Sequence, residues 1–222
     1  MVDQLPPMKV AGRLGQLRGC LEAEPCEGLV VTSITNIRYL TGFSGSAGLL
    51  WVDDTRAVLV TDGRYSDQAP EELNEAGVDA DVEIAGVDQH AALARLAQRC
   101  STIGLEAHNA TWEFQRRISA ALNGKQVVPT HDLVETLREV KDSGELARIA
   151  AAATIADASL AEIWAMLDDE PTELDVSTAL DEGMRHRGAT DRAFATIVAC
   201  GPNSCLLYTS PSPRDGLLSR MP

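Results

Sequence analysis

The sequence predicts an α/β domain, in which helices pack on a mixed sheet, followed by the beginning of a second domain. Short apolar runs rich in β-branched residues alternate with amphipathic stretches through the first part of the chain, which is typical of this class. Two of the runs, "AGLLWV" and "AVLVT", flank the polar segment "DDTR" and are expected to form a hairpin. Farther on, apolar residues recur at intervals of three and four, which indicates a long helix.

Six strands and three helices are expected in the first domain. Strands are predicted where apolar and β-branched residues cluster, at 28–32, 47–52, 57–61, 79–84, 102–106 and 125–129. Helices are predicted at 63–77, 88–100 and 111–122. Pro70 either breaks the first helix or delays its start, because proline lacks the amide hydrogen that a helix interior needs.

The second region is predicted to begin with a long helix. Asp142 stands three residues before Glu145, a spacing typical of a capping box at a helix start. The apolar face of this helix continues to Leu167. A second helix is expected after an N-cap at Thr172, and an apolar strand is expected at 193–199.

Charge and hydropathy exclude several classes of protein. The chain has 222 residues, a formal net charge of −14 and 45% hydrophobic residues. A surface this acidic repels phosphate backbones and anionic lipid headgroups, so we expect neither nucleic acid nor a membrane as a partner. The most apolar long stretch, 146–167, carries Arg148, Asp157 and Glu162 and is not expected to span a bilayer.

Cysteine usage and the N-terminal segment indicate the compartment. The chain has five cysteines, an odd number, and none forms a C-x-x-C pair. This pattern is typical of free thiols in a reducing environment. The segment "MVDQLPPMKVAGRL" lacks the apolar core of a signal peptide. Together these features predict a cytoplasmic protein.

No complete catalytic set can be defined from spacing. "GFSGSAG" enters a strand and lacks the Lys of a phosphate-binding loop, so a tight glycine loop is the favoured interpretation. None of the four histidines lies three or four residues from another, so no zinc motif is present. "NIRYLTGF" and "TDGRY" each pair an Arg with a Tyr. Their guanidinium groups either recognise a carboxylate or pair with local acids such as Asp62, and the second interpretation is favoured.

Several phrases, taken in order, resemble one family. They are "NIRYLTGFSGSAG", "TDGRY", "VKDSGELARI" and "RGATDRAFATIVACGPNS". Through roughly residues 10 to 204 the chain is similar to Xaa-Pro aminopeptidases and their prolidase and creatinase relatives, which are metallopeptidases of family M24. The resemblance implies a creatinase/prolidase-type α/β domain with a mixed sheet at 1–138. It also implies a linker helix and the incomplete beginning of an α+β pita-bread domain at 139–204.

The resemblance further implies a chemistry, the removal of the first residue from peptides with proline in second position. In the family, two divalent ions, often manganese, hold a bridging hydroxide that attacks the peptide bond. Their ligands are two Asp, one His and two Glu, and all follow the strand that leads into "GPNS". The intact parent protein is therefore expected to bind two divalent metal ions, and this chain none.

The last segment, "CLLYTSPSPRDGLLSRMP", differs from the rest of the chain and is expected to be a non-native tail at 205–222. It has no helical or strand period and resembles translated adapter sequence. Tyr208 stands about where the family has a substrate-contacting His, and Asp215 is a lone Asp where two metal ligands should follow. We therefore assign no catalytic and no metal-binding residue to this chain, and we expect it to be inactive.

Two alternatives to a peptidase front portion stay open. In the family, the N-terminal domain packs in dimers and helps to wall the partner's active site, so a non-catalytic dimerisation or peptide-binding module is the second hypothesis. The substrate-facing wall is assigned to Arg38, Phe43 and Arg64. The third hypothesis is a prolidase or creatinase-type hydrolase on the same scaffold. Proline-containing peptides and a second copy of the chain are the expected partners.

Overall fold

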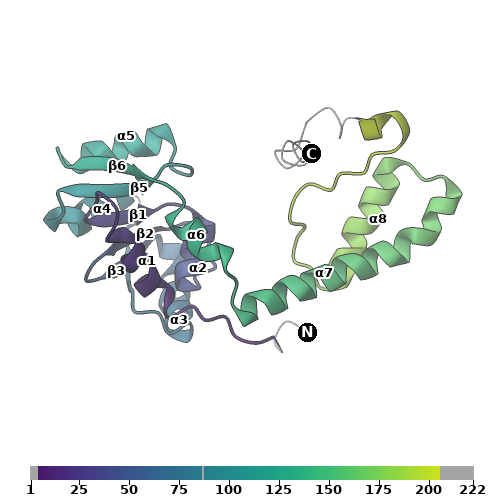
Figure 1. Cartoon of the computed structure of the whole chain (residues 1–222), viewed down its shortest axis with the longest axis horizontal. Helices are drawn as coiled ribbons and strands as arrows, with labels where there is room; N and C mark the ends of the chain where they lie inside the picture. Colours follow the sequence, from purple (N-terminus) through teal and green to yellow (C-terminus); the bar gives the residue numbers. More distant parts are fainter. Residues whose placement is uncertain (1–4, 87, 206–222) are drawn as a thin grey trace, which may run out of the picture. The chain divides into compact units, whose positions relative to one another are not determined.

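The chain forms two compact units in a computed structural model, which describes residues 5–86 and 88–205. The N-terminal unit runs from Pro6 to Glu145, and the C-terminal unit holds the described residues from Leu146 onward. Figure 1 follows the order of the elements along the chain. The α/β architecture predicted for the first part of the chain lies in the N-terminal unit.

The N-terminal unit is built on a six-stranded sheet with the order β4-β3-β2-β1-β5-β6. Its strands are β1 (Gly28–Val31), β2 (Leu49–Asp53), β3 (Ala57–Thr61), β4 (Asp81–Ile84), β5 (Thr102–Glu106) and β6 (Gln126–Thr130). The β1/β2 and β2/β3 pairs are antiparallel, whereas β3/β4, β1/β5 and β5/β6 are parallel. The mixed sheet, the hairpin and all six predicted strands are therefore confirmed.

Helices cover both faces of this sheet (Figure 1). They are α1 (Arg13–Leu21), α2 (Ile34–Thr41), α3 (Gln68–Glu75), α4 (Gln89–Leu96), α5 (Trp112–Ala121) and α6 (Leu133–Glu139), with short 3₁₀ turns η2 (Gly63–Tyr65) and η3 (Ala97–Arg99). The predicted helices at 88–100 and 111–122 are confirmed, and the one at 63–77 is divided into η2 and α3. Sequence patterns missed α1, α2 and α6, which are short, and α1 also contains two helix-weakening glycines.

Two apolar clusters hold the sheet and its helices together, one on each face. Successive side chains of a strand point to opposite faces of the sheet. Leu29 and Val31 therefore lie in the first cluster and Val30 lies in the second. The first cluster packs the sheet against α1, α2, α3 and α6, and the second packs it against α4 and α5. Strands β1, β2 and β3 are buried along their whole length, as expected for a sheet covered on both faces.

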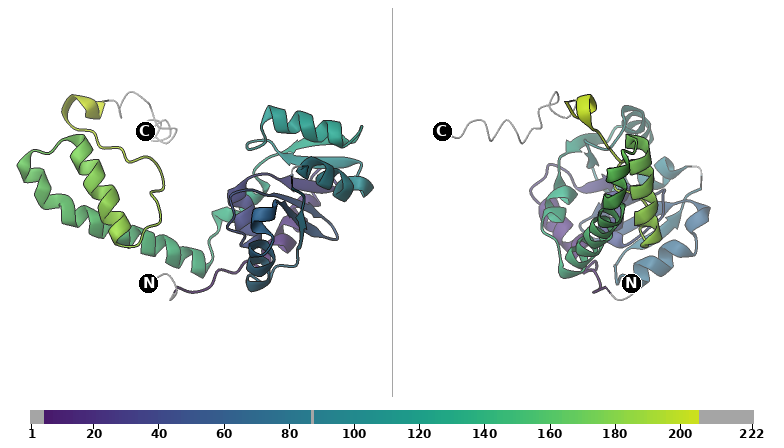
Figure 2. Two further views of the ribbon diagram at one scale, coloured as in Figure 1. Left: turned by 180° about the vertical axis from the view of Figure 1, so that it is seen from behind. Right: turned by 90° about the vertical axis from the view of Figure 1, so that its right-hand side faces the viewer.

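The C-terminal unit is a pair of helices followed by an irregular segment. It contains most of α7 (Ser143–Ile163), then η4 (Trp164–Asp169), α8 (Glu173–His186) and η5 (Gly201–Cys205). Figure 2 shows α7 and α8 side by side. Ser159 lies against Gly183 where the two helices meet, and Arg187 pairs with Glu162 at 2.5 Å. Both predicted helices are confirmed.

The helix start at Thr172 has the predicted cap. The Thr172 hydroxyl accepts a hydrogen bond from the Asp175 amide at 3.2 Å, and the Asp175 carboxylate accepts one from the Thr172 amide at 3.0 Å. This reciprocal arrangement is a capping box, and it satisfies amide groups that the first turn of a helix leaves unpaired.

The strand predicted at 193–199 is wrong. The structure has no regular element at these residues. A strand needs a neighbour to satisfy its backbone groups, and the described residues of the C-terminal unit supply none. Apolar side chains in this segment stay open to solvent, with Phe194 73% and Ile197 69% exposed.

Much of the apolar face of α7 is also exposed, although Ile163 is buried. Leu146, Ile149 and Leu160 are 56%, 55% and 47% exposed, respectively. By length and composition alone, Ser143–Asp169 is apolar enough to cross a membrane, with a mean hydropathy of 1.3. A single helix of this kind is weak support for a membrane span, because core helices of soluble proteins meet the same criterion.

Candidate functional site

The three residues assigned to a substrate-facing wall come from two neighbouring segments. Arg38 lies on α2, and Phe43 opens the glycine loop that joins α2 to β2. Arg64 lies on η2, which directly follows β3. Because β2 and β3 are antiparallel neighbours, the end of the glycine loop and the start of η2 meet at the same end of these two strands.

Phe43 has a structural role in this arrangement. Its side chain is 0% exposed and belongs to the first apolar cluster. The Tyr65 ring packs edge-on against it, with ring centroids 5.3 Å apart and an interplanar angle of 87°. A buried ring cannot line a solvent-accessible surface, so the assignment of Phe43 to the wall is corrected: it supports the loop from beneath.

The serines of the loop are held by side chains from the following elements. Glu72 of α3 accepts hydrogen bonds from the Ser44 amide at 2.8 Å and from the Ser44 hydroxyl at 2.5 Å. Gln68 donates to both Ser44 and Glu72 at 3.0 Å. Burial alone would raise the pKa of Glu72, but these hydrogen bonds outweigh it and the pKa is lowered. The carboxylate therefore stays charged at neutral pH.

Tyr65 holds the middle of the same loop. Its hydroxyl accepts a hydrogen bond from the Ser46 amide at 3.0 Å and shares another with the Ser46 hydroxyl at 2.8 Å. Hydrogen bonding with Ser46 lowers the pKa of the Tyr65 phenol. Two separate anchors, Glu72 and Tyr65, thus fix the loop.

Arg64 is paired locally, as the favoured interpretation predicted. Its Nε and a terminal nitrogen donate to the two Asp62 carboxylate oxygens at 2.9 and 2.8 Å. Hydrogen bonds from Arg64 lower the pKa of Asp62. The Arg64 guanidinium also lies 5.2 Å from the centroid of the Tyr65 ring. Arg38 is exposed, and its charge contributes to lowering the pKa of Glu72.

Glycine is required at two positions of the loop. Gly42 ends α2 with φ at +81°, the left-handed conformation that glycine adopts at helix ends. A Cβ at Gly45 would lie 2.2 Å from Cζ of Phe43, so no side chain fits there. The interpretation of "GFSGSAG" as a tight loop is therefore confirmed, and the reason at Gly45 is the close approach of the buried ring.

Metal-binding residues were not expected in this chain. Among residues 5–86 and 88–205, no three His, Cys, Asp or Glu side chains gather into a group that could hold a metal ion. Tyr208 and Asp215, which the sequence places near the family's missing ligands, lie outside the described residues. The residues that the structure describes therefore do not fit a two-metal centre.

Comparisons with known proteins agree with the fold. The model of the creatinase/prolidase N-terminal domain matches residues 13–140, and the model of metallopeptidase family M24 matches residues 147–220. The second match thus extends across the segment that sequence patterns set apart as a tail. An uncharacterized peptidase, YqhT, of Bacillus subtilis is 32% identical over 87% of this chain and 54% of its own length.

Solved structures give the same result. An Xaa-Pro dipeptidase from Bacillus anthracis superposes with a TM-score of 0.78 at 30% identity, over 87% of this chain and 54% of that one. An X-Pro aminopeptidase from Thermotoga maritima gives 0.71 at 29% identity, with the same coverage of both chains. The chain therefore spans about half the length of these relatives, 54% in each case.

The mixed sheet, the helices on both faces and the anchored glycine loop define an N-terminal domain of the creatinase/prolidase type. The chain belongs to the creatinase/prolidase family, and it continues into a segment similar to the M24 metallopeptidases. Sequence analysis missed Ser44, Gln68 and Glu72 as loop anchors. No local pattern reveals them, because Glu72 lies 28 residues from Ser44.

Proposed function

We propose that this chain is the front portion of an Xaa-Pro aminopeptidase, a dinuclear-metal hydrolase that removes the first residue from peptides with proline in second position. One observation carries the proposal: a creatinase/prolidase N-terminal domain is followed, in a single chain, by a segment that matches family M24. The whole protein would act in the cytoplasm on proline-containing peptides, and it would assemble as a homodimer or larger oligomer.

We propose that the metal ligands lie in a part of the parent protein outside the described residues. When bound, two divalent ions, with manganese as the proposed metal, would activate a water and polarise the scissile carbonyl. The described residues offer no donor set for them, so we assign no catalytic step to this chain. We propose that the 222-residue chain is inactive by itself.

Two measurements test this proposal. The source DNA is sequenced again across codon 204, and we expect a frame that continues into a His and then into the Asp, His and Glu ligands. A genuine stop after "CLLYTSPSPRDGLLSRMP" would contradict the enzyme assignment and the proposed non-native tail. The purified chain is also assayed with Xaa-Pro peptides and added manganese, and turnover above the buffer blank would contradict its proposed inactivity.

The second candidate is a non-catalytic dimerisation or peptide-binding module formed by the N-terminal domain. The glycine loop supports this second candidate. Glu72 and Tyr65 hold the loop in place, and a surface held in this way is suited to contact a partner or a peptide. Arg38 and Arg64 are then the exposed residues of the wall, with Phe43 beneath them. Residues 1–138 should form a dimer in analytical ultracentrifugation. If residues 1–138 stay monomeric and bind no peptide, the hypothesis of a dimerisation or peptide-binding module is contradicted.

A prolidase or creatinase-type hydrolase is the third candidate, supported by the similarity to the Bacillus anthracis dipeptidase. Substrate length separates it from the first. With the full-length protein, an aminopeptidase cleaves Ala-Pro-Ala, whereas a prolidase cleaves only Ala-Pro and a creatinase cleaves creatine. Gly-Ala-Ala serves as the control without proline.

A further inference from the structure

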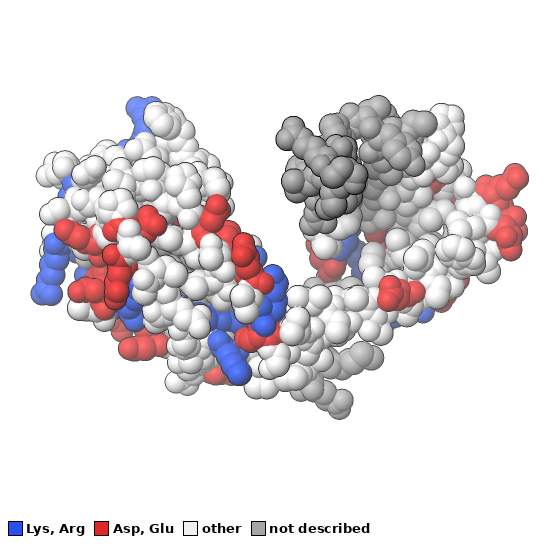
Figure 3. Space-filling view, viewed as in Figure 1, with Lys and Arg blue, Asp and Glu red and all other residues white. Residues whose placement is uncertain are grey.

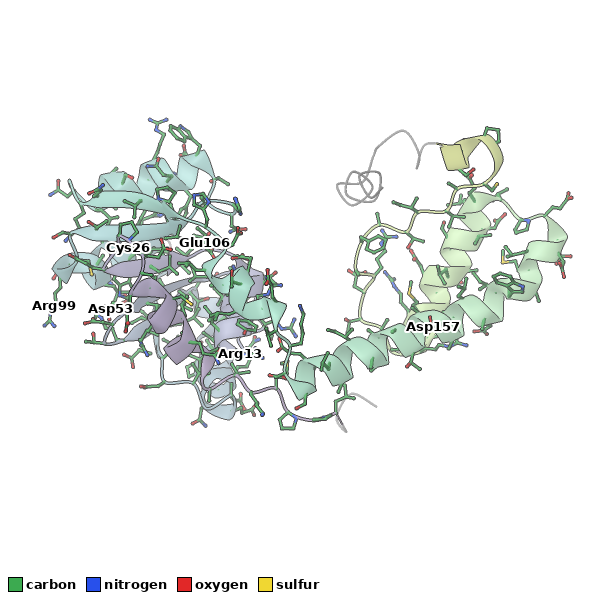
Figure 4. The ribbon with its side chains drawn as sticks, viewed as in Figure 1. Arg13, Cys26, Asp53, Arg99, Glu106 and Asp157 are labelled. Atoms are coloured by element: carbon green, nitrogen blue, oxygen red, sulfur yellow. The ribbon has the colours of Figure 1, made fainter. Side chains whose placement is uncertain are left out.

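A hollow of about 940 Å³ opens at one end of the sheet in the N-terminal unit, away from the glycine loop. It lies at the C-terminal end of β2. The last turn of α1, the last turn of α4 and the short helix η3 come together there. A volume of this size is within the range of small-molecule sites. Cys26, Asp53 and Arg99, all of which line it, are labelled at this end of the unit in Figure 4.

Asp53, which lines the hollow, is held by several hydrogen bonds. The Asp53 carboxylate accepts hydrogen bonds from Trp51 Nε1 at 2.9 Å, from the Arg56 amide at 2.8 Å and from the Thr55 hydroxyl at 2.9 Å. Asp53 is 7% exposed. Arg56 in turn donates to the Leu96 carbonyl at 2.7 Å, which joins the β2–β3 turn to the end of α4. The Asp53 carboxylate is thus already hydrogen-bonded within the protein and is not counted as a ligand-binding group.

The lining carries equal numbers of positive and negative groups. Four are arginines, Arg18, Arg56, Arg95 and Arg99, and four are acids, Glu22, Glu27, Asp53 and Asp54. Figure 3 shows basic and acidic side chains interspersed on the surface of the N-terminal unit. A lining with four charges of each sign favours a ligand that carries both signs over a simple anion or cation.

Several of these charges already have partners. Arg56 pairs with Asp53, Arg95 pairs with Glu83, and Glu27 accepts from the Ser101 amide. Within the part of the chain that the structure describes, five lining groups have no oppositely charged partner. They are the guanidinium groups of Arg18 and Arg99 and the carboxylates of Glu22, Glu27 and Asp54, of which Glu27 is held by the Ser101 amide.

The Arg18 side chain is held in a defined position. Its Nε donates to the Asp53 carbonyl at 2.9 Å, which fixes the guanidinium and leaves its terminal nitrogens available. Neutral groups fill the rest of the lining, among them Leu21, Leu96 and the thiols of Cys26 and Cys100. Burial raises the pKa of both thiols, so neither adds negative charge at neutral pH.

We propose that this hollow binds a short zwitterionic peptide with free termini. Its carboxylate lies between Arg18 and Arg99, its ammonium group faces Glu22 and Asp54, and its apolar side chains contact Leu21 and Leu96. The volume of about 940 Å³ has room for more than a single amino acid, so we assign a di- or tripeptide. The site needs no metal and does not rest on the proposed peptidase function.

The test uses the full chain and the tripeptide Ala-Ala-Leu, which contains no proline. Binding is followed by amide chemical shifts in ¹⁵N-labelled protein. We expect saturable shifts at residues around the hollow, and about tenfold weaker binding when either terminus is capped by acetylation or amidation. Arg99→Gln should weaken binding to a similar extent. Arg116→Gln removes an exposed arginine of α5 outside the hollow and should leave binding unchanged.

Three outcomes would overturn the proposal. One is the absence of shifts at about 10 mM peptide, well above the millimolar affinity of a weak site. Another is equal binding of the free and doubly capped peptides, which would show that the hollow does not recognise the charged termini of the peptide. A third is equal weakening by Arg99→Gln and Arg116→Gln, which would indicate non-specific attraction. Since Arg99 is exposed and has no side-chain partner among the described residues, its substitution is expected to leave the fold intact.

Discussion

The Arg13 guanidinium donates a hydrogen bond to the Asp142 carboxylate at 2.8 Å, across 129 residues of chain. It also donates to the Tyr39 carbonyl at 2.8 Å, lies 4.0 Å from the centroid of the Tyr39 ring, and pairs with Glu145 at 3.1 Å. Asp142 and Glu145 form the capping box of α7, with reciprocal hydrogen bonds of 3.0 and 2.8 Å. Arg13 therefore attaches the first turn of α7 to α1 and α2.

Replacing Arg13 by Met should destabilise the N-terminal unit by about 3 kcal/mol, because two largely buried carboxylates lose their common cation. The Arg13 side chain is only 5% exposed, and those of Asp142 and Glu145 are 16% and 19% exposed. Urea unfolding followed by tryptophan fluorescence measures the change. Arg117→Met is the matched control, because Arg117 and Glu113 are 66% and 63% exposed and should contribute less than about 1 kcal/mol. Equal effects of the two substitutions would contradict the assigned role of Arg13.

Asp53 should make stability depend on pH in the acidic range. Burial by itself would raise the pKa of Asp53, but hydrogen bonds from Trp51, Arg56 and Thr55 hold it at about 2. Since this pKa lies below that of an unfolded Asp, the stabilisation is present above about pH 4 and is lost as the pH falls towards 2. We expect the wild-type chain to lose about 2 kcal/mol more than Asp53→Asn between these limits. Parallel pH profiles for the two proteins would exclude this linkage.

Glu106→Gln should destabilise the unit by about 2 kcal/mol, although the two side chains have nearly the same shape. The Glu106 carboxylate accepts hydrogen bonds from the amides of Thr32 and Ser33 at 2.6 and 2.8 Å and from Asn36 Nδ2 at 2.7 Å. A glutamine NH₂ group would face one of these donors. Glu113→Gln, at an exposed position, is the control, and thermal melting compares the two variants. An unchanged melting temperature for Glu106→Gln would show that the network can rearrange without cost.

Gly45→Ala should disturb the glycine loop, because the new Cβ would lie 2.2 Å from the Phe43 ring. We expect a loss of about 1–3 kcal/mol and altered side-chain signals for Phe43 and Tyr65. Gly63→Ala is the matched control, since a Cβ at Gly63 meets no atom within 4 Å. If Gly45→Ala behaves like Gly63→Ala, the loop is not fixed by the packing described above.

Residues 140–222 by themselves should not melt cooperatively. The apolar side chains of Leu146, Ile149 and Trp164 are 56%, 55% and 65% exposed, so each forfeits part of the roughly 1.5–3 kcal/mol that full burial contributes. Large exposed apolar surfaces also promote aggregation. Differential scanning calorimetry of this segment provides the measurement, and a single cooperative transition would contradict the prediction.

The successes and failures of the sequence predictions follow from the range of the interactions involved. All six strands were predictable because each contains a cluster of apolar or β-branched residues within a short segment. The capping box at Thr172 was predictable because its two partners lie three residues apart. The strand expected at 193–199 failed for the opposite reason: its residues favour an extended conformation, but strand pairing depends on a distant partner.

For the candidate site, the local pairing of Arg64 with Asp62 followed from adjacency in the sequence. The burial of Phe43 did not, because it depends on how Tyr65 and the first apolar cluster close over the loop. The anchoring of Ser44 by Glu72 and the attachment of Asp142 to Arg13 are also invisible in local patterns. By itself, the sequence determined the α/β class, the positions of the strands and the glycine loop, since these depend on short-range periodicity and composition. It also carried the resemblance to the family, which rests on several short motifs in a fixed order. Only the tertiary structure decided which buried polar groups meet, because those contacts join residues that are brought together when the sheet and its helices pack.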